Sequence, residues 1–545
     1  MNNKNILLLL LFISSSLFAR QRTGEEMIQI AKMTLSQTAT RGVSSQVKLL
    51  DETDVFAVYG DSESFAVISK DDCHKPVWGY SFTSYDKSSM PCGFQWWLSQ
   101  VKETMQTRAA IDQLDGFEPE VIAPLIKSTW GQGDPFNYLC PTLGGRRGVT
   151  GCVATATSQI LRYYRYPSVS NGRGYYTLGE NASPMYVNVH NEYKWDLLKD
   201  SYASAWFLTD DEKNAIAQLM YDAGVASHMN YASDGSGATV FEAANGLAQV
   251  FQMDSLAMKC VGRSYCKDDV EWLNIIKQEL KNNHPLLMAA QSPTGGHAFV
   301  LDGMDADGKI HINWGWDGKF DGYFEFNNLN PSSYHYDSKQ YVVTNLRLDP
   351  TPTEDEEFHS CWVLSVEDDI QTDMLNGLTI MADNGILWQN SHMTFYGKLG
   401  VAFFDENNNE IYFHTMIDTS DKKNGFSPVY GGHGFYVSYF SKITVSDLAN
   451  IPAGKYRVFL ASKAIQDKTP QFICYPGGKH NEYTLVKSED NTLTISKSET
   501  SSIHSLKAST STNGSYYNLQ GHDFGTSKDA LPKGIYIIGG KKVVK

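Results

Sequence analysis

The spacing of apolar residues near the start of the chain predicts two amphipathic helices separated by short strands. Residues 24–39 form the first predicted helix, and the second begins at Pro91, a residue suited to a first helical turn. Two apolar runs, 55–59 and 64–68, flank a Gly-Asp turn signal and predict a β-hairpin. These elements indicate a small α+β unit at the N-terminal end.

From about residue 120 to residue 350 the pattern passes from helices to strands. A helix is expected over 152–164, and another, over 268–280, leads into the second half of this region. The strands expected after it cover 298–301, 310–313 and 323–326. Helices followed by strands, with Gly and Asp turn signals between them, predict a second α+β domain.

Only short strands with turn signals are expected from about residue 358 to 495. This spacing predicts an antiparallel β-sandwich. Residues 498–515 are rich in Ser and Thr and are typical of a flexible linker. A compact apolar piece, 534–542, follows near the end.

Chain length, net charge and the first residues limit the classes of protein to which the chain could belong. A chain of 545 residues is long enough for three or four folded units. The formal net charge of -15, without basic blocks among aromatics, disfavours nucleic acid as a partner. Lys4, the apolar run 6–13 and Ala19 predict a signal peptide over residues 1–19, since that run is too short to cross a bilayer.

The eight cysteines are scattered along the chain and form no Cys-x-x-Cys pair. This distribution is unlike a dense disulfide framework and unlike a structural zinc site. We therefore expect no metal and no organic cofactor, and at least one thiol that stays free to react.

Cys152 is the strongest candidate for such a thiol. It follows Gly151 and stands at the first position of a predicted helix, where the helix dipole favours the thiolate. Taken alone, a small buried hydrophobe is the commoner role of a free cysteine. The residues elsewhere in the chain decide between the two interpretations.

Four further residues complete a set that suits nucleophilic catalysis. His297 follows Cys152 by 145 positions (297 minus 152), within the spacing typical of papain-type enzymes. Asn313 offers an oxygen that could orient an imidazole, and Trp314 could shield that contact. Gln132 is suited to donate into an oxyanion hole. Each residue is weak evidence singly, but their order matches a papain-like arrangement.

The same segments resemble a known family. The motifs Trp130-Gly131-Gln132, 151–156, 296–303 and 312–316 are similar to those of the streptopain and interpain family, secreted bacterial cysteine peptidases with a papain fold. Residues 229–231 and 235–238 resemble a loop near the family's substrate cleft, and 65–68 with 76–81 resemble its inhibitory propeptide. The resemblance spans about residues 56–350.

The resemblance implies a role for each matching residue. Cys152 would be the nucleophile, His297 the general base, Gln132 the oxyanion donor, and Asn313 with Trp314 the orienting pair. It also implies a precursor whose propeptide blocks or displaces the catalytic histidine. Cleavage between about residues 107 and 119 would release the enzyme.

These inferences divide the chain into five parts. They are a signal peptide (1–19), an inhibitory α+β propeptide (20–108), a papain-like peptidase domain (109–350), an all-β sandwich domain (351–497), and a linker with a C-terminal segment (498–545). Residues 517–521 and 533–538, with Lys541 and Lys542, look like the ends of exported Bacteroidetes proteins sorted by type IX secretion. An ordinary terminal strand pair is the alternative interpretation of this segment.

The sequence therefore predicts a secreted cysteine endopeptidase of a Gram-negative bacterium, free or held at the outer membrane or cell surface. Protein or peptide substrates and its own propeptide are the expected partners, with the secretion machinery or a cell-surface contact for the C-terminal region. Two alternatives stay open: a papain-like amidase or transglutaminase that uses the same thioester, and a non-catalytic surface-binding protein.

Overall fold

The structure is a computed structural model of the chain, which divides into two compact units, Met1–Ile495 and Ser496–Lys545. It describes residues 20–36, 46–106, 116–179, 182–203, 207–255, 258–292, 295–326, 340–348, 362–364, 370–373, 377–380, 385–389, 394–426, 433–437, 442–474, 482–498, 517–518, 535–538 and 541–544. The predicted signal peptide and most of the predicted cleavage segment lie outside these residues.

The helices begin close to the predicted positions. The α-helices are α2 (Gly24–Ser36), α3 (Cys92–Gln106), α4 (Cys152–Tyr164), α5 (Asp210–Ala226), α6 (Val240–Gln249) and α7 (Asp269–Lys281), and the short 3-10 turns are η2 (Lys87–Ser89), η3 (Trp195–Leu197) and η5 (Arg263–Tyr265). Four of them, α2, α3, α4 and α7, confirm the helices expected from apolar spacing.

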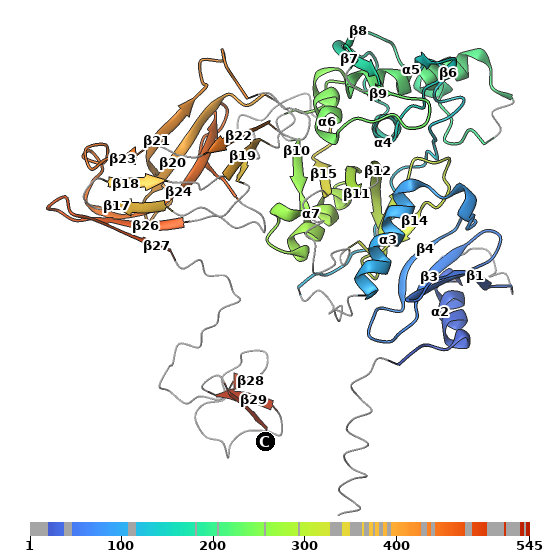
Figure 1. Ribbon diagram of the computed structural model, residues 1–545, viewed down its shortest axis with the longest axis horizontal. Coiled ribbons are helices and arrows are strands. Elements are labelled where there is room, and N and C mark those ends of the chain that lie inside the picture. Colours follow the sequence, from blue (N-terminus) through green and yellow to red (C-terminus); the bar gives the residue numbers. More distant parts are fainter. Residues whose placement is uncertain are drawn as a thin grey trace, which may run out of the picture. The chain divides into compact units, whose positions relative to one another are not determined.

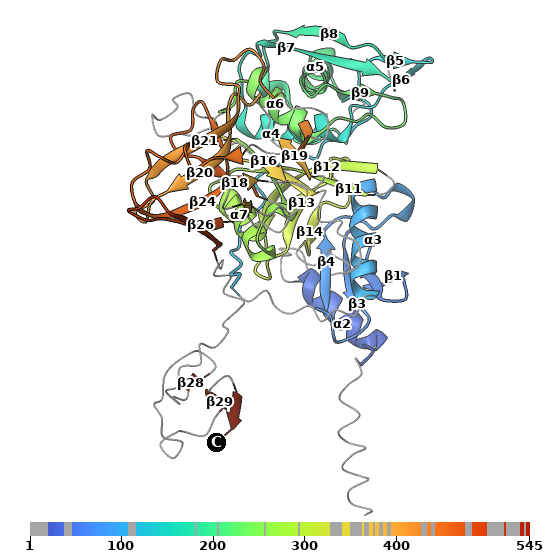
Figure 2. The ribbon, with the colours of Figure 1, turned by 60° about the vertical axis from the view of Figure 1, so that its left-hand side comes forward.

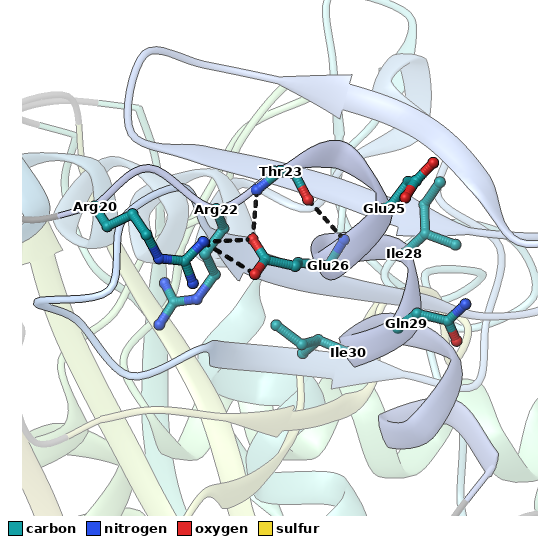
Figure 3. Close-up of a pocket in the computed structure, with 8 residues that line it drawn as sticks. All are labelled: Arg20, Arg22, Thr23, Glu25, Glu26, Ile28, Gln29 and Ile30. Atoms are coloured by element: carbon teal, nitrogen blue, oxygen red, sulfur yellow. Dashed lines mark hydrogen bonds and ion pairs between the residues drawn. The ribbon is translucent and has the colours of Figure 1, made fainter.

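Helix α2 starts where a polar cap satisfies its free backbone N–H groups. The Thr23 hydroxyl accepts from the Glu26 N–H at 3.2 Å, and the Glu26 carboxylate accepts from the Thr23 N–H at 2.7 Å. Arg20 donates to the same carboxylate at 3.0 Å and lowers the pKa of Glu26 to about 2. Figure 3 shows these contacts at the edge of a surface hollow lined by residues 20–30.

A ten-stranded antiparallel sheet forms the frame of the molecule up to residue 348. Its order is β1-β2-β3-β4-β14-β13-β12-β11-β15-β10. The strands are β1 (Lys48–Glu52), β2 (Phe56–Gly60), β3 (Phe65–Ser69), β4 (Val77–Ser81), β10 (Lys259–Gly262), β11 (Leu286–Ser292), β12 (Gly295–Met304), β13 (Ile310–Asn313), β14 (Gly322–Phe324) and β15 (Gln340–Thr344). The expected hairpin is confirmed, with Val58 opposite Val67.

The N-terminal strands are part of the same sheet as the strands after residue 258 (Figure 1). Strand β4 pairs with β14, so that Tyr80 lies opposite Tyr323 and Gly79 opposite Phe324. The α+β character expected for the N-terminal region is confirmed. Its pairing with β14 was not predicted, because local apolar patterns do not specify a partner about 240 residues away.

Successive side chains of β2 and β3 point to opposite faces of the sheet, and both faces are covered. Ala57, Tyr59 and Ile68 pack against α2, whereas Val58, Val67 and Trp78 pack in a core shared with α3. The core on the α3 side extends over β11–β14 and includes side chains of α7. The N-terminal region and the sheet beyond it therefore share one hydrophobic interior.

The other face of β11, β12 and β15 is covered by a helical layer. Helices α4, α5 and α6 pack around a core that includes Leu287, Val300 and Val343 of the sheet. Smaller strands border this layer: β5 (Thr142–Leu143), β6 (Arg146–Arg147), β7 (Gly172–Leu178), β8 (Met185–Val189) and β9 (Asn230–Tyr231). Strands β11, β12 and β15 are thus buried on both faces, which positions their ends rigidly beside α4.

The described residues between 362 and 497 form strands joined by turns, as expected. Its strands are β16 (Trp362–Leu364), β17 (Ile370–Asp373), β18 (Gly377–Ile380), β19 (Gly385–Gln389), β20 (Gly397–Phe404), β21 (Glu410–Asp418), β22 (His433–Val437), β23 (Lys442–Ile443), β24 (Gly454–Ala464), β25 (Gln471–Phe472), β26 (Glu482–Lys487) and β27 (Leu493–Lys497). Leu387, Val401, Ile443 and Val458 come from three sheets and share one core, as in a sandwich.

The second unit holds a small antiparallel sheet of three strands, β28 (Tyr517–Asn518), β29 (Ile535–Ile538) and β30 (Lys541–Val544). Strands β29 and β30 form the hairpin near the end of the chain. Among the described residues, no helix has both the length and the apolar character needed to cross a membrane.

Candidate active site

Cys152 is the first residue of α4, and its surroundings explain the glycine before it. Gly151 has φ 86°, in the region that favours glycine, and a Cβ there would lie 2.8 Å from the Met229 sulfur and 2.9 Å from the Ser236 carbonyl oxygen. No side chain caps α4. The first turn of the helix therefore directs its backbone N–H groups at the Cys152 side chain rather than at a capping residue.

The Cys152 sulfur accepts a hydrogen bond from the Ala298 N–H at 3.4 Å. Burial raises the pKa of the Cys152 thiol, and hydrogen bonds from backbone N–H groups, with Ala298 the largest contributor, oppose that rise. The sequence had predicted a thiolate favoured by the helix dipole. In this state of the molecule burial has the largest effect on the pKa of Cys152, and it acts against the predicted thiolate.

His297 lies next to Ala298 on β12 but faces a different cysteine. Its Nδ1 is 3.1 Å from the Cys92 sulfur at the start of α3. Within the described residues no hydrogen bond joins His297 to Cys152. Burial lowers the pKa of His297, while burial and the nearby Cys152 raise the pKa of Cys92 to about 11. The structure brings the predicted nucleophile and base to adjacent positions without joining them.

The start of α3 fills the space beside His297 and Trp314. A Cβ on Gly93 would lie 2.8 Å from the Trp314 ring and 3.8 Å from the His297 Cβ. The backbone of α3 therefore packs so closely on Trp314 that there is no room for a side chain at position 93. Phe94 packs edge-on against Trp314, with 6.1 Å between ring centroids. Figure 2 shows α3 alongside β12. The N-terminal region therefore contacts two side chains, His297 and Trp314, that the sequence predicts to be catalytic.

Asn313 ends β13, and its amide is bound to groups other than His297. Its Oδ1 accepts from the Gln159 side-chain amide at 2.9 Å and from the Gly315 N–H at 3.1 Å. Its Nδ2 donates to the Ser128 carbonyl oxygen at 2.8 Å. In this state the side chain predicted to orient His297 is instead bound to α4 and to residue 128.

Trp314 is buried under the aromatic residues of the sheet. Its ring lies 4.9 Å from that of Phe299, and its indole N–H donates to the Phe320 carbonyl oxygen at 3.1 Å. Its backbone N–H donates to Asp321 at 2.9 Å. Burial raises the pKa of Asp321 to about 7, so this carboxyl group titrates near neutral pH directly below Trp314.

Gln132 lies on the segment that approaches Cys152 from the other side. Its carbonyl oxygen accepts from the Thr150 N–H at 3.1 Å, which ties it to the turn before the nucleophile. Its side-chain amide makes no hydrogen bond with the described residues. A side-chain donor that makes no hydrogen bond within the described part of the chain is compatible with the predicted oxyanion role.

Two residues near the site were not expected from the sequence. Cys92 contacts His297, and Gln159 contacts Asn313. Cys92 could have been found from the sequence, because it follows Pro91 at the start of a predicted helix. A position at the start of a helix was the feature that identified Cys152 as a reactive thiol. Gln159 had a weaker signal, a polar residue in an otherwise small and apolar stretch of α4.

One group of described side chains could hold a metal ion. Asp71, Cys73 and His74 place their ligand atoms within 4.8 Å of one another in the loop after β3. Asp71 lies 2.6 Å from the His74 Nδ1 and accepts from Cys73 at 2.9 Å, so these groups already satisfy one another. Arg22 binds the His74 carbonyl oxygen beside them, which disfavours a cation. The absence of a metal in catalysis stays a prediction.

Comparison with known proteins finds similarity over the same region. The model of the Peptidase C10 family matches residues 130–324. The thiol protease/hemagglutinin PrtT of Porphyromonas gingivalis is 31% identical over 296 residues, which cover 50% of this chain and 34% of that protein. Streptopain of Streptococcus pyogenes is 29% identical over 298 residues, covering 49% of this chain and 73% of streptopain. The chain thus spans only about a third of the length of the first of these relatives.

A solved structure is similar in fold as well as sequence. The fragment of prointerpain A of Prevotella intermedia is 32% identical, with a TM-score of 0.51, and the match covers 56% of this chain and 100% of that fragment. The fragment is a precursor form, as its name states. The match therefore includes an N-terminal region in addition to the residues that match the family model.

Proposed function

The chain belongs to the peptidase C10 family, and on this premise we propose that it is a cysteine endopeptidase made as an inactive precursor. One observation carries the proposal: Cys152 opens α4 beside Ala298, and the neighbouring His297 is occupied by Cys92 of the N-terminal region. Thiol proteases among the relatives support the same class of reaction.

The proposed reaction is acyl transfer through a thioester. The Cys152 thiolate attacks a peptide carbonyl carbon, and the Gln132 amide with the Cys152 N–H stabilises the developing oxyanion. His297, as imidazolium, donates its proton to the leaving amine. His297 then takes a proton from water, which hydrolyses the thioester and releases the carboxylic acid. Trp314 excludes water from one side of the imidazole.

Residues 20–106 act as the inhibitory propeptide in this proposal. Three kinds of contact support it: strand pairing of β4 with β14, the Lys75–Glu325 ion pair at 3.1 Å, and the Trp97 indole N–H on the Glu325 carbonyl oxygen at 2.9 Å. Cleavage between residues 107 and 119 leaves all three intact. Activation therefore needs dissociation or digestion of the propeptide after the cut.

Export is part of the proposal as well. Residues 1–19 serve as the signal peptide, and the segment 498–545 serves in sorting through type IX secretion or in contact at the surface of a Gram-negative cell. The charge and apolar pattern of the first 19 residues support export, and the terminal β29–β30 hairpin is a folded element that a sorting receptor could bind.

Digestion of casein tests the proposed function. We expect processed protein in reducing buffer to digest casein with a linear dependence on enzyme concentration, because reduction keeps Cys152 as a thiol. The freshly purified precursor should show a lag before digestion begins. Intact casein after complete removal of residues 20–106 would contradict the proposal, and products in which amines replace the cleaved acyl group would favour a transferase.

Replacement of Cys92 tests its part in inhibition. Cys92→Ala removes the group that holds the His297 Nδ1, so we expect the half-time of self-processing to shorten by about 2- to 10-fold, the effect of losing one hydrogen bond. Cys92→Ser keeps a donor at the same place and should mature at a rate close to that of the wild type. The measurement is the loss of the precursor band with time.

Cys73→Ala is the matched control for Cys92, because Cys73 is another thiol of the propeptide and is bound to Asp71 rather than to the active site. Its maturation rate should equal that of the wild type. An unchanged or longer half-time for Cys92→Ala would show that the contact with His297 does not contribute to latency.

A further inference from the structure

Gln159 lies on α4 two turns after Cys152 and is fully buried. Its side-chain amide pairs head to tail with that of Asn313. Gln159 Nε2 donates to Asn313 Oδ1 at 2.9 Å, and Asn313 Nδ2 donates to Gln159 Oε1 at 3.3 Å. This pair connects the helix that carries the nucleophile with the end of β13.

The same amide also binds the segment that leads to Gln132. Gln159 Oε1 accepts from the Trp130 N–H at 3.2 Å and from the Ser128 hydroxyl at 3.0 Å. The Ser128 carbonyl oxygen in turn accepts from Asn313 Nδ2. Gln159, Asn313 and Ser128 therefore form a closed buried network in which each side chain has its partners.

Three segments meet in this network, and each carries a group of the proposed mechanism. Helix α4 bears Cys152, residues 128–132 bear Gln132, and residues 313–315 bear Trp314. Transition-state stabilisation depends on the placement of these groups to within a fraction of an ångström. A buried side chain that belongs to α4 and binds the other two segments is well placed to set those distances.

We propose that Gln159 is a positioning residue, which fixes the oxyanion segment and the Asn313–Trp314 turn relative to Cys152. This inference rests on the proposed peptidase function. Gln159 does not touch substrate, because its side chain is enclosed by protein on all sides. In this arrangement Asn313 binds Gln159. Because Gln159 and Cys152 are both on α4, this bond holds Asn313 in place relative to the nucleophile.

The test compares two replacements of Gln159. Gln159→Met has a side chain of similar length that makes no hydrogen bonds. It therefore removes the bonds from α4 to residues 128–130 and to Asn313. Gln159→Glu keeps the acceptor oxygen and loses the donor to Asn313 Oδ1, and only its protonated form restores a donor. Each precursor is processed by tagged wild-type enzyme that is then removed, and kcat and KM are measured on a peptide from pH 5 to pH 8.

We expect Gln159→Met to lower kcat by about 10- to 100-fold with KM changed less than about twofold, the pattern of an interaction used in the transition state. The rate at which iodoacetamide alkylates Cys152 should stay within about twofold of the wild-type rate, since alkylation does not use the oxyanion site. For Gln159→Glu, kcat relative to wild type should rise as the pH falls, because a protonated carboxyl can donate to Asn313.

Thr157→Val is the matched control. Thr157 is buried on the same helix, and its hydroxyl has no hydrogen-bond partner among the residues that the structure describes, so the replacement removes a buried polar group outside the network. It should keep wild-type kcat and KM. If Gln159→Met cannot be folded, the pH dependence of Gln159→Glu still decides the matter.

Two results would overturn the inference. One is a kcat for Gln159→Met within twofold of the wild type. The other is a pair of observations: the alkylation rate of Cys152 in Gln159→Met falls as much as kcat does, and the kcat of Gln159→Glu relative to wild type does not change with pH. Together they would indicate a general defect of α4. In both cases the wild type remains active, whereas failure of the proposed function would leave the wild type itself inactive.

Discussion

Processed protein with Cys152 replaced by alanine is expected to lose casein hydrolysis by about 10⁴-fold or more. The thioester cannot form without the sulfur, and the remaining groups supply only binding and oxyanion stabilisation. Cys92, another thiol beside the site, lies in the proposed propeptide and is expected to leave with it. The Cys152→Ala precursor should also stay full-length on storage, since self-processing uses the same thiol.

The control for this loss is Cys266→Ala, which removes a buried thiol from the core that holds α7. It should retain casein hydrolysis, with a reduction in thermal stability that follows from the smaller side chain. Self-processing or casein digestion by Cys152→Ala at more than a few per cent of the wild-type rate would exclude Cys152 as the nucleophile.

The second large effect is expected at His297. His297→Ala should lower kcat/KM by about 10⁴-fold, because no other group would remove the thiol proton or protonate the leaving amine. Burial, to which the N-terminal helix α3 contributes, holds the pKa of His297 below its ordinary value. Removing the propeptide exposes the ring, so its pKa should rise and favour an imidazolium paired with the Cys152 thiolate.

Alkylation of Cys152 as a function of pH reports this pairing. In the processed wild type, iodoacetamide should react rapidly even near pH 6, because the ion pair keeps the sulfur deprotonated. In His297→Ala, rapid alkylation should appear only above about pH 8, near the ordinary thiol pKa. His190→Ala, at an exposed histidine, is the control and should match the wild type. Identical pH profiles for His297→Ala and wild type would refute the pairing.

The local pattern of apolar residues was sufficient to predict the helix and the strand that carry Cys152 and His297. Apolar spacing after Cys152 predicted α4 with its bounds, and the apolar run 298–301 predicted a strand that is part of β12. These features depend on neighbours in sequence. They are readable because helix and strand periodicities are local properties.

Contacts across the sheet were not predictable in the same way. The pairing of β4 with β14 and the approach of Cys92 to His297 join residues more than 200 positions apart. The partner of Asn313 was also missed. Asn313 was expected to orient an imidazole, but its amide oxygen can accept from any nearby donor, and in the structure Gln159 supplies one.

The state of the molecule explains the remaining difference. The thiolate at Cys152 and its contact with His297 were expected of the active enzyme, whereas the resemblance also implied a precursor in which the histidine is blocked or displaced. In the structure the N-terminal strands are part of the sheet, α3 packs on Trp314, burial raises the pKa of Cys152, and His297 faces Cys92. The boundaries at residues 108 and 350 and the roles of the site residues remain predictions.

One measurement tests the central claim most directly: peptide mapping by mass spectrometry after processed protein has reacted with a peptidyl epoxide. We predict a single adduct, on the peptide that contains Cys152, with loss of casein hydrolysis in proportion to labelling and no adduct on the intact precursor. An adduct on another cysteine that tracks the loss of activity, or full activity with Cys152 completely labelled, would contradict the assignment.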